Sequence, residues 1–301
     1  MILELKNIEK SFGEKKVLTD VSFKAEGGKA FGLLGRNGAG KTTSIRILMN
    51  VFPANRGQVL IDGEPIDYNK IGIGYLPEER GLYPKKIIID QLTYFAELKG
   101  MSRKEAVKAI DYWLGRLGMT EYRNKKLETL SKGNQQKIQL ITALAHDPDI
   151  VILDEPFSGL DPVNAMLLKD VVKEQIAKGK IVLFSSHQMS YIEEFCDSIA
   201  ILNNGIVALH GDLHDIKRDY PRDRLVVKTE TPDAIVADFG SSCKVLNGGE
   251  LMIRLGSPSE KKAVMTRIVE NYDVDEVRVF EPSLNDIFVE VAGDGAKEDE
   301  K

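Results

Sequence analysis

The sequence predicts an α/β protein in which a largely parallel sheet is covered by helices, with a small α+β domain after it. The first observation is a glycine-rich loop between a short buried strand at Lys29–Leu34 and an apolar helix at Thr43–Asn50. The second is an alternation of apolar β-type runs with helices from about Asp149 to Asn203. Such an alternation is typical of parallel strands that are covered on both faces.

Length and composition bound the class of protein. The chain has 301 residues, enough for one large and one smaller domain. It is 43% hydrophobic and 29% charged, as soluble globular proteins are. The net charge of −5 argues against broad binding of nucleic acid, which usually goes with a basic surface, and leaves a local basic groove open. The two cysteines, Cys196 and Cys243, have no metal-ligand spacing, and this favours a reducing cytosol.

The first part of the chain is expected to be rich in strands. Ile2–Lys6, Val17–Lys24 and Gln58–Ile61 alternate apolar and polar residues, and turn residues separate them. No apolar run approaches the roughly 20 residues that cross a bilayer. We therefore expect that any membrane-spanning segment is supplied by another chain.

From about Ile87 to Ala145 the pattern becomes helical. Ser102 and Glu105 form a capping box, which predicts a helix start at that point. This stretch is predicted to be a helical subdomain. Strands and helices then alternate, as Asp149–Leu153 (strand), Val163–Ala177 (helix), Lys180–Ser185 (strand), Met189–Phe195 (helix) and Ile199–Asn203 (strand).

The last third of the chain is predicted to be a separate domain. Asp219–Asp223 has the composition of a linker, so we place one domain at 1–218 and a second at 224–291. The second contains strand, helix, hairpin, helix, strand and a last helix, an order that suggests a ferredoxin-like α+β fold. The hairpin is expected to turn at Asn247–Gly249. The tail, 293–301, is expected to be disordered.

The glycine-rich loop reads G-x-x-x-x-G-K-[ST] over Gly35–Thr42. Glycines without a Cβ let successive N–H groups turn toward an anion at the N-terminus of the following helix. Lys41 would reach the β- and γ-phosphates, and Thr42 would offer its hydroxyl to Mg²⁺. The residues expected to bind nucleotide are Gly35, Asn37, Gly38, Ala39, Gly40, Lys41, Thr42 and Thr43.

A second motif, DIVILDEPFSGLDP, occupies Asp149–Pro162. Its apolar strand ends in two acids, which places both carboxylates at the carboxyl edge of the sheet, where α/β proteins bind ligands. Asp154 is predicted to hold Mg²⁺. Glu155 is predicted to act as the general base that polarises the attacking water.

Together these motifs resemble the ATP-binding-cassette (ABC) family, in family order across about residues 2–215. Four further stretches carry the resemblance: Leu130–Gln135 (LSKGNQ) is similar to the family's signature, Ser158–Asp161 to its D-loop, Ser185–His187 to its switch histidine, and Tyr75–Glu78 to its Q-loop. The match implies an ABC ATPase cassette with a helical subdomain at about 87–145. A P-loop kinase or GTPase is disfavoured, because those proteins lack the signature and switch motifs.

The resemblance also implies roles for single residues. Phe12 would stack on adenine, although it could instead be a core residue. His187 would be the catalytic switch histidine, and Asp161 would bind nucleotide from the D-loop. In this family two cassettes pair head to tail, so Ser131 and Gly133 would bind the ATP held by the other subunit's Lys41.

Two departures from the family pattern concern charge and the signature. Glu78 replaces the usual glutamine and adds a negative charge near the expected Mg²⁺. It is expected to be a metal ligand, unless it faces solvent or a partner protein. In the signature, Lys132 and Asn134 replace glycine and glutamine, whereas Ser131 and Gly133 are kept.

The function implied by the resemblance is that of an ATPase subunit of an ABC transporter, with ATP and Mg²⁺ as cofactors. Ile73–Pro84 (IGYLPEERGLYP) and Glu281–Gly293 (EPSLNDIFVEVAG) look like the bacterial NatA-type exporter branch. Expected partners are a second copy of the chain and a separate membrane permease, without nucleic acid. The expected location is cytoplasmic, at the inner face of the membrane. The alternative is a soluble ABC ATPase that acts on ribosomes or DNA.

Overall fold

The computed structural model describes residues 1–79, 81–157, 160–186, 188–246 and 249–293. The chain forms two compact units. The first contains Met1–Leu213 and takes up the chain again from Phe288, and the second is His214–Ile287. We call them the cassette and the C-terminal unit. These limits differ from the predicted domains, because residues 214–218 belong to the C-terminal unit and residues 288–291 belong to the cassette.

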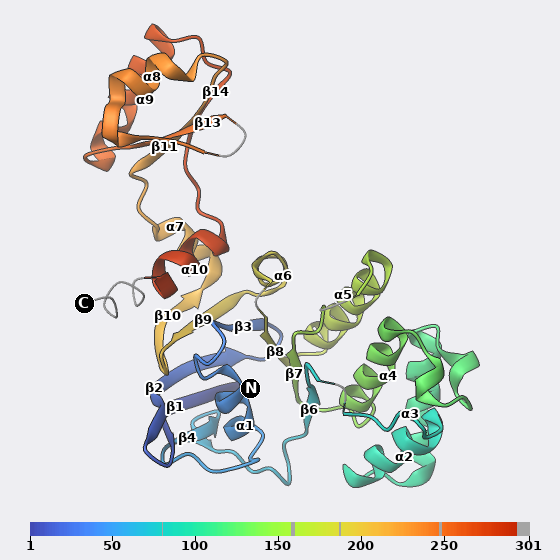
Figure 1. Ribbon diagram of the computed structural model, residues 1–301. Coiled ribbons are helices and arrows are strands. Elements are labelled where there is room, and N and C mark those ends of the chain that lie inside the picture. The colour runs from blue at the N-terminus through green and yellow to red at the C-terminus, as the bar shows by residue number, and fades with distance from the viewer. Residues whose placement is uncertain (80, 158–159, 187, 247–248, 294–301) are drawn as a thin grey trace. The chain divides into compact units, whose positions relative to one another are not determined.

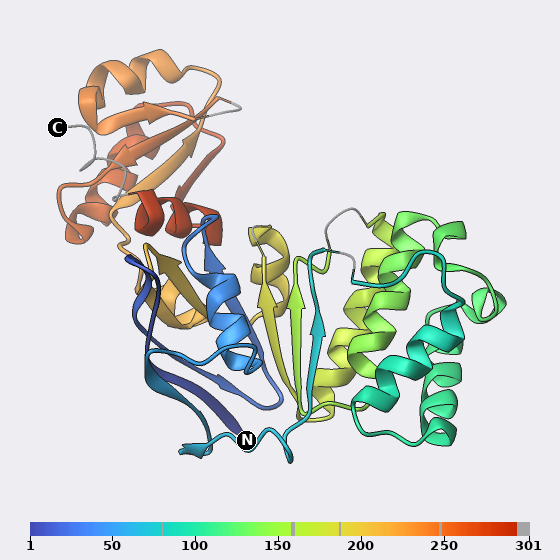
Figure 2. The same ribbon diagram turned by 60° about the horizontal axis from the view of Figure 1, so that its bottom comes forward.

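The cassette is built on one mixed sheet, in the order β5-β4-β1-β2-β10-β9-β3-β8-β7-β6. Strands β9, β3, β8, β7 and β6 are parallel to one another, and Figure 2 shows β6, β7 and β8 side by side. The strands are β1 (Ile2–Phe12), β2 (Lys15–Glu26), β3 (Ala30–Gly35), β4 (Arg56–Ile61), β5 (Glu64–Pro65), β6 (Ile73–Leu76), β7 (Ile150–Asp154), β8 (Ile181–Ser185), β9 (Ser198–Asn203) and β10 (Ile206–Asp212).

Burial explains the two kinds of strand. Every residue of β3, β7 and β8 is buried, so these strands read as continuous apolar runs. Strands β1, β2 and β4 pair antiparallel, and β1 and β2 alternate buried and exposed residues. The predicted α/β class is confirmed, with an antiparallel portion at the amino-terminal side of the sheet.

The helices of the cassette lie on both sides of strands β7 and β8. Helices α2, α3 and α4 lie beyond β6, on the opposite side of β7 and β8 from α1 (Figures 1 and 2). The predicted capping box is confirmed, because the Ser102 hydroxyl accepts from the Glu105 N–H and the Glu105 carboxylate accepts from the Ser102 N–H. The helices are α1 (Lys41–Leu48), α2 (Ile88–Leu98), α3 (Arg103–Arg116), α4 (Lys132–Leu144), α5 (Pro162–Ala177) and α6 (Met189–Phe195).

The C-terminal unit has the ferredoxin-like order that the sequence suggested. Its four strands are antiparallel in the order β12-β13-β11-β14. Its core contains Leu225, Val227, Leu251, Ile253 and Ile268. The elements are α7 (Leu213–Asp219, entering from the cassette), β11 (Arg224–Lys228), α8 (Pro232–Phe239), β12 (Cys243–Val245), β13 (Glu250–Arg254), α9 (Lys261–Asn271) and β14 (Glu276–Val279).

Several boundaries differ from the predictions. Strand β1 extends to Phe12, and β6 and β10 were not predicted as separate strands. Helix α10 (Leu284–Gly293) includes Gly293, so the expected disordered tail does not begin there. Residues 294–301, and Asn247 and Gly248 of the expected hairpin turn, lie outside the described residues. None of the described helices has the length and apolarity needed to cross a bilayer.

Candidate active site

The glycine-rich loop connects β3 to α1 inside the cassette. Ile45, Ile47 and Leu48 of α1 pack into the core, and this fixes the helix whose first residue is Lys41. Gly40 caps the helix with a φ of 111°, a left-handed conformation that favours glycine. Gly38 has a φ of 82°, and an added Cβ would meet no atom within 4 Å. The backbone at Gly38 therefore faces open space beside the helix N-terminus, as an anion site requires.

Lys41 lies over this loop. Its Nζ donates to the carbonyl oxygens of Gly35 at 2.6 Å and Arg36 at 3.3 Å. Burial lowers the pKa of Lys41, while the negative charges of Glu155, Asp154 and Glu78 act in the opposite direction. The structure thus brings the loop lysine and all three predicted carboxylates into one electrostatic site.

Three more of the predicted nucleotide residues, Asn37, Ala39 and Thr42, belong to the same loop, and Thr43 follows it. Asn37 and Thr42 are exposed and Thr43 is half-buried, whereas Ala39 is buried beneath the loop. Phe12 is 50% exposed, so the core alternative for this residue is excluded. Its ring meets Phe52 edge to face, with centroids 5.4 Å apart. An exposed aromatic face of this kind is able to stack on a base.

Asp154 ends β7 and is only 7% exposed. The Tyr75 hydroxyl on β6 donates to its Oδ2 at 3.2 Å. Burial raises the pKa of Asp154, and the hydrogen bond from Tyr75 partly opposes that rise. Burial also raises the pKa of Tyr75, with a further contribution from the Asp154 charge, so this phenol remains a donor to the carboxylate.

Glu155 is also 7% exposed and has a positive φ of 49°. A non-glycine residue in this region is strained, and such residues cluster at functional sites. Its N–H donates to the Ser185 carbonyl at 2.8 Å, and the Ser186 hydroxyl donates to its Oε2 at 2.9 Å. The last residue of β8 therefore fixes the backbone of the predicted base, and the residue after β8 fixes its carboxylate.

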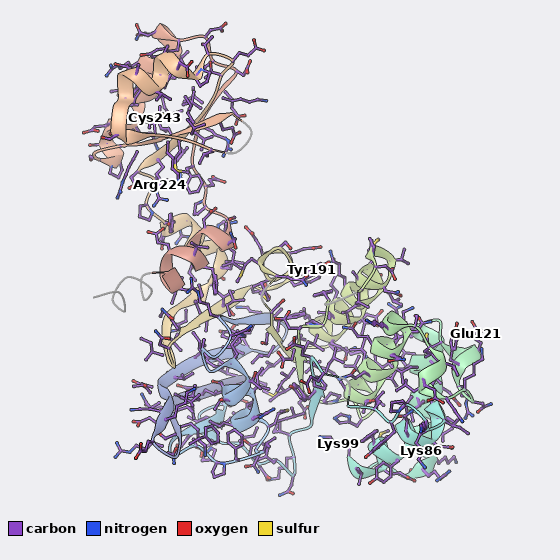
Figure 3. All side chains as sticks on the ribbon, in the orientation of Figure 1. Lys86, Lys99, Glu121, Tyr191, Arg224 and Cys243 are labelled. Carbon is purple, nitrogen blue, oxygen red and sulfur yellow. The ribbon has the colours of Figure 1, made fainter. Side chains whose placement is uncertain are left out.

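The segment after Glu155 is anchored by aromatic packing. Phe157 is buried, and its ring stacks on Tyr191 with centroids 4.2 Å apart. Tyr191 belongs to α6, as Figure 3 shows. Helix α6 follows the predicted switch residue His187, which itself lies outside the described residues together with Ser158 and Gly159.

Glu78 lies in the loop after β6 and is exposed. Its charge acts on both Lys41 and Tyr75, which places it at the rim of the site. A role as a metal ligand stays a prediction, as do the roles of the other candidate residues.

The signature residues lie at a different place in the cassette. Ser131 caps α4, and its hydroxyl accepts from the Asn134 N–H at 3.4 Å. Asp161 caps α5 by accepting from the Asn164 N–H at 3.0 Å. A Cβ added to Gly133 would lie 3.2 Å from Asn164 Nδ2, so the signature and the end of the D-loop meet. Helix α4 and helix α1 lie on opposite sides of β7 and β8 (Figures 1 and 2).

The donor set fits magnesium bound together with a nucleotide. Within the described ranges no three His, Cys, Asp or Glu side chains form a complete metal cage. Mg²⁺ usually takes one or two carboxylates from the protein and further oxygens from substrate phosphates and water. Asp154 is a carboxylate of this kind, and Thr42, next to Lys41 in the loop, and Glu78 remain predicted ligands.

Comparison with known proteins decides the family. A model of the ABC transporter family matches residues 18–158. An ABC transporter ATP-binding protein of Bacillus subtilis, YhaQ, is 40% identical over 97% of this chain and 99% of its own length. The chain belongs to the ABC transporter ATP-binding proteins. It is an ABC ATPase, and ATP hydrolysis is the activity of that family.

Further relatives cover both units of this ABC ATPase. The C-terminal domain model of DrrA1-3-like ATP-binding proteins matches residues 211–292. The linearmycin resistance ATP-binding protein LnrL of B. subtilis is 30% identical over 97% of this chain and 98% of its own. The structure of an ATP-binding subunit of an ABC transporter matches with a TM-score of 0.67 and 32% identity, over 73% of this chain and 93% of that one. The dimeric cassette MJ0796 matches with a TM-score of 0.62 and 25% identity, over 70% and 98%.

Sequence reasoning missed three contributors to this ABC site. Tyr75 was noted only as part of the Q-loop match, and Ser186 only as part of the switch motif. Gln139 received no role, although a glutamine between Ile138 and Leu140 in an apolar stretch is a detectable signal. Each acts through a hydrogen bond to a partner distant in sequence, which no local motif reveals.

Proposed function

We propose that this ABC ATPase drives export through a separately encoded membrane permease, working as a head-to-tail homodimer at the inner face of the membrane. The observation that carries the proposal is the site at which Lys41 shares its electrostatic surroundings with Asp154, Glu155 and Glu78. Relatives named for export support the direction. One is the Nod factor export ATP-binding protein I of Burkholderia lata, which is 32% identical over 70% of this chain and 71% of its own.

In the proposed reaction the loop binds the ATP phosphates and Lys41 pairs with the β- and γ-phosphates. Thr42 and Asp154, with Glu78 at the rim, would hold Mg²⁺, which neutralises charge on those phosphates. Glu155 accepts a proton from the water that attacks the γ-phosphate, with its carboxylate oriented by Ser186. His187 is proposed to act as the switch histidine, and Phe12 is proposed to stack on adenine.

The proposed dimer follows from the separation of α1 and α4. Ser131 caps α4 and Gly133 lies in its first turn, and α4 lies on the opposite side of β7 and β8 from α1, which begins at Lys41 (Figure 2). A head-to-tail partner would bring a second loop to this signature and to Asp161. A closed two-fold pair, whose single interface contains two equivalent nucleotide sites, is the simplest assembly that satisfies both sites.

A surface for the permease follows the Glu78 loop. Tyr83, Ile87, Tyr94 and Leu98 are large apolar residues and all are exposed. Tyr94 and Leu98 lie one turn apart on α2, and Tyr83 stacks on Phe95 of the same helix, with centroids 6.2 Å apart. Exposed apolar patches of this kind mark protein-binding surfaces. A transport partner is favoured over ribosomes or DNA because the relative YhaQ is named as an ABC transporter ATP-binding protein.

Mixing two inactive variants tests the head-to-tail site. Lys41→Ala and Ser131→Ala should each be inactive as homodimers. Their mixture should regain ATPase activity, since one site per mixed dimer combines an intact Lys41 with an intact Ser131. Ser102→Ala is the matched control, because it removes the cap of α3 away from the site. Full activity of Ser131→Ala alone, or no recovery on mixing, would contradict the dimer.

A Mg²⁺ titration tests Glu78. Glu78→Gln restores the usual family residue and removes one charge, so the Mg²⁺ concentration for half-maximal hydrolysis should shift while ATP binding persists. Glu79→Gln changes the exposed neighbouring carboxylate and should leave the titration unchanged. If the Mg²⁺ dependence of hydrolysis is unchanged in Glu78→Gln, Glu78 faces solvent or the permease.

A further inference from the structure

Helix α4 carries, beyond the signature, a buried glutamine, Gln139, and a half-buried one, Gln136. Gln139 is only 6% exposed and stands between the buried residues Ile138 and Leu140. Gln136 precedes it by three residues, so both side chains leave the same face of α4. A buried amide costs free energy unless its polar atoms find partners. Both amides find them in loops that approach the nucleotide site.

Gln139 holds the loop that carries Glu78. Its Nε2 donates to the carbonyl oxygens of Pro77 and Glu79, each at 3.1 Å. These carbonyls flank Glu78, so one side chain fixes the backbone on both sides of that carboxylate. The loop leaves β6, whose Tyr75 donates to Asp154.

Gln136 holds the neighbouring loop. Its Nε2 donates to the carbonyl oxygen of Pro156, the residue after Glu155. Helix α4, which begins at the signature, is thus tied by two amides to the loops after β6 and β7. Because these hydrogen bonds join α4 to both loops, we expect a displacement of α4 to act on both carboxylates.

We propose that Gln139 is a positioning residue that ties the placement of Glu78 to the signature helix. When the partner's nucleotide engages Ser131, the shift of α4 acts on the Glu78 loop through the Gln139 amide. Gln136 provides the parallel connection to Glu155. This inference rests on the proposed function, since it assigns Glu78 and Ser131 to one catalytic cycle.

Gln139→Met tests the inference, because methionine fills a similar volume and removes both hydrogen bonds. Loosening a loop beside the reacting groups should lower kcat by about 10- to 100-fold, with the Kd for MgATP changed less than about twofold. Native-state hydrogen exchange at the amides of Glu78 and Glu79 should accelerate, and this measurement needs no nucleotide. A role in packing alone predicts that Gln139→Met keeps the wild-type kcat.

The matched control is Gln175→Met on α5. Gln175 is likewise buried, and its Nε2 makes no hydrogen bond to the described residues. The Gln175→Met variant should retain the wild-type kcat and the wild-type hydrogen-exchange rates at the amides of Glu78 and Glu79. If Gln139→Met does not fold, Gln139→Asn, which keeps the amide but shortens its reach, takes its place with the same expectations.

A double-mutant cycle with Glu78→Ala separates positioning from general stability. If Gln139 acts through Glu78, Gln139→Met should lower kcat much less in the Glu78→Ala background, whereas independent effects multiply. Wild-type kcat in Gln139→Met, or full multiplication in the cycle, overturns the inference. If the wild-type protein binds no MgATP, the proposed function is wrong. Unchanged hydrogen exchange at Glu78 and Glu79 in Gln139→Met would then still contradict the link between Gln139 and the Glu78 loop.

Discussion

The cassette and the C-terminal unit differ in what they bury. In the described residues of the cassette the buried polar side chains include Asp154, Glu155, Gln139, Ser185 and Ser186. In the C-terminal unit the one such residue described is Thr229, whose hydroxyl donates to the Asp273 carbonyl at 2.6 Å. The apolar core of that unit is otherwise ordinary.

This difference distinguishes the unit with the candidate catalytic side chains from the unit with an ordinary apolar core. Burying charged and polar groups costs free energy, and buried ionisable groups cluster at functional sites. In the cassette, buried carboxylates act on Lys41, and the backbone of Glu155 is strained. We infer that the C-terminal unit contributes to regulation or to dimer stability, and that catalysis belongs to the cassette.

The largest expected effect is the loss of MgATP affinity in Lys41→Ala. Loss of the cation from the loop should weaken MgATP binding about 100-fold or more, as expected when one member of a charge-assisted pair is removed. Lys24→Ala, at an exposed lysine that pairs with Glu4, should bind like the wild type. Calorimetric titration of both variants measures this, and retained affinity in Lys41→Ala would remove the loop from the site.

Glu155→Gln should lower kcat by about 10²–10⁴-fold while ATP still binds, because the amide keeps the shape and an acceptor for Ser186 but loses the base. The ATP-bound dimer should then persist and be visible by size-exclusion chromatography. Glu97→Gln, at an exposed site on α2, serves as the control. Wild-type turnover by Glu155→Gln would end its assignment as the general base.

Cavities in the two cores should have different consequences. Ile268→Ala in the C-terminal unit and Ile152→Ala in β7 each truncate a fully buried side chain and should cost about 2–5 kcal/mol of unfolding free energy. Only Ile152→Ala should also impair MgATP binding, since β7 leads to Asp154. Denaturant unfolding and nucleotide titration measure both quantities. Lost ATP affinity in Ile268→Ala would give the C-terminal unit a direct part in the site.

The smallest expected effect concerns the two cysteines. Burial raises the pKa of Cys196 strongly, and it raises that of Cys243, which is half-buried, less. Each unit of pKa lowers the thiolate fraction about tenfold, so iodoacetamide should alkylate Cys243 (labelled in Figure 3) before Cys196. Mass spectrometry resolves the two rates, and raising the pH should speed the reaction at Cys243. Equal rates would show that Cys196 is more accessible than its burial implies.

Local patterns were sufficient for much of the fold. The buried runs at β7 and β8, the capping box at Ser102 and the βαββαβ order of the C-terminal unit were all readable, because each depends on neighbours in the sequence. Strands β6 and β10 were not, since both are short or half-exposed and become strands through their partners. The return of the chain to the cassette at Phe288 also leaves no local signal.

The sequence by itself determined the family, the loop with Lys41 and the acidic pair Asp154–Glu155, because those motifs are contiguous and their chemistry depends on residue type. Only the tertiary structure decided that Tyr75 donates to Asp154, that Ser186 orients Glu155, and that Gln139 holds the backbone around Glu78. Each of these contacts joins residues that are 31 to 79 positions apart. Hydrogen bonds are short-ranged and directional, so they exist only after the sheet has brought those strands and α4 together.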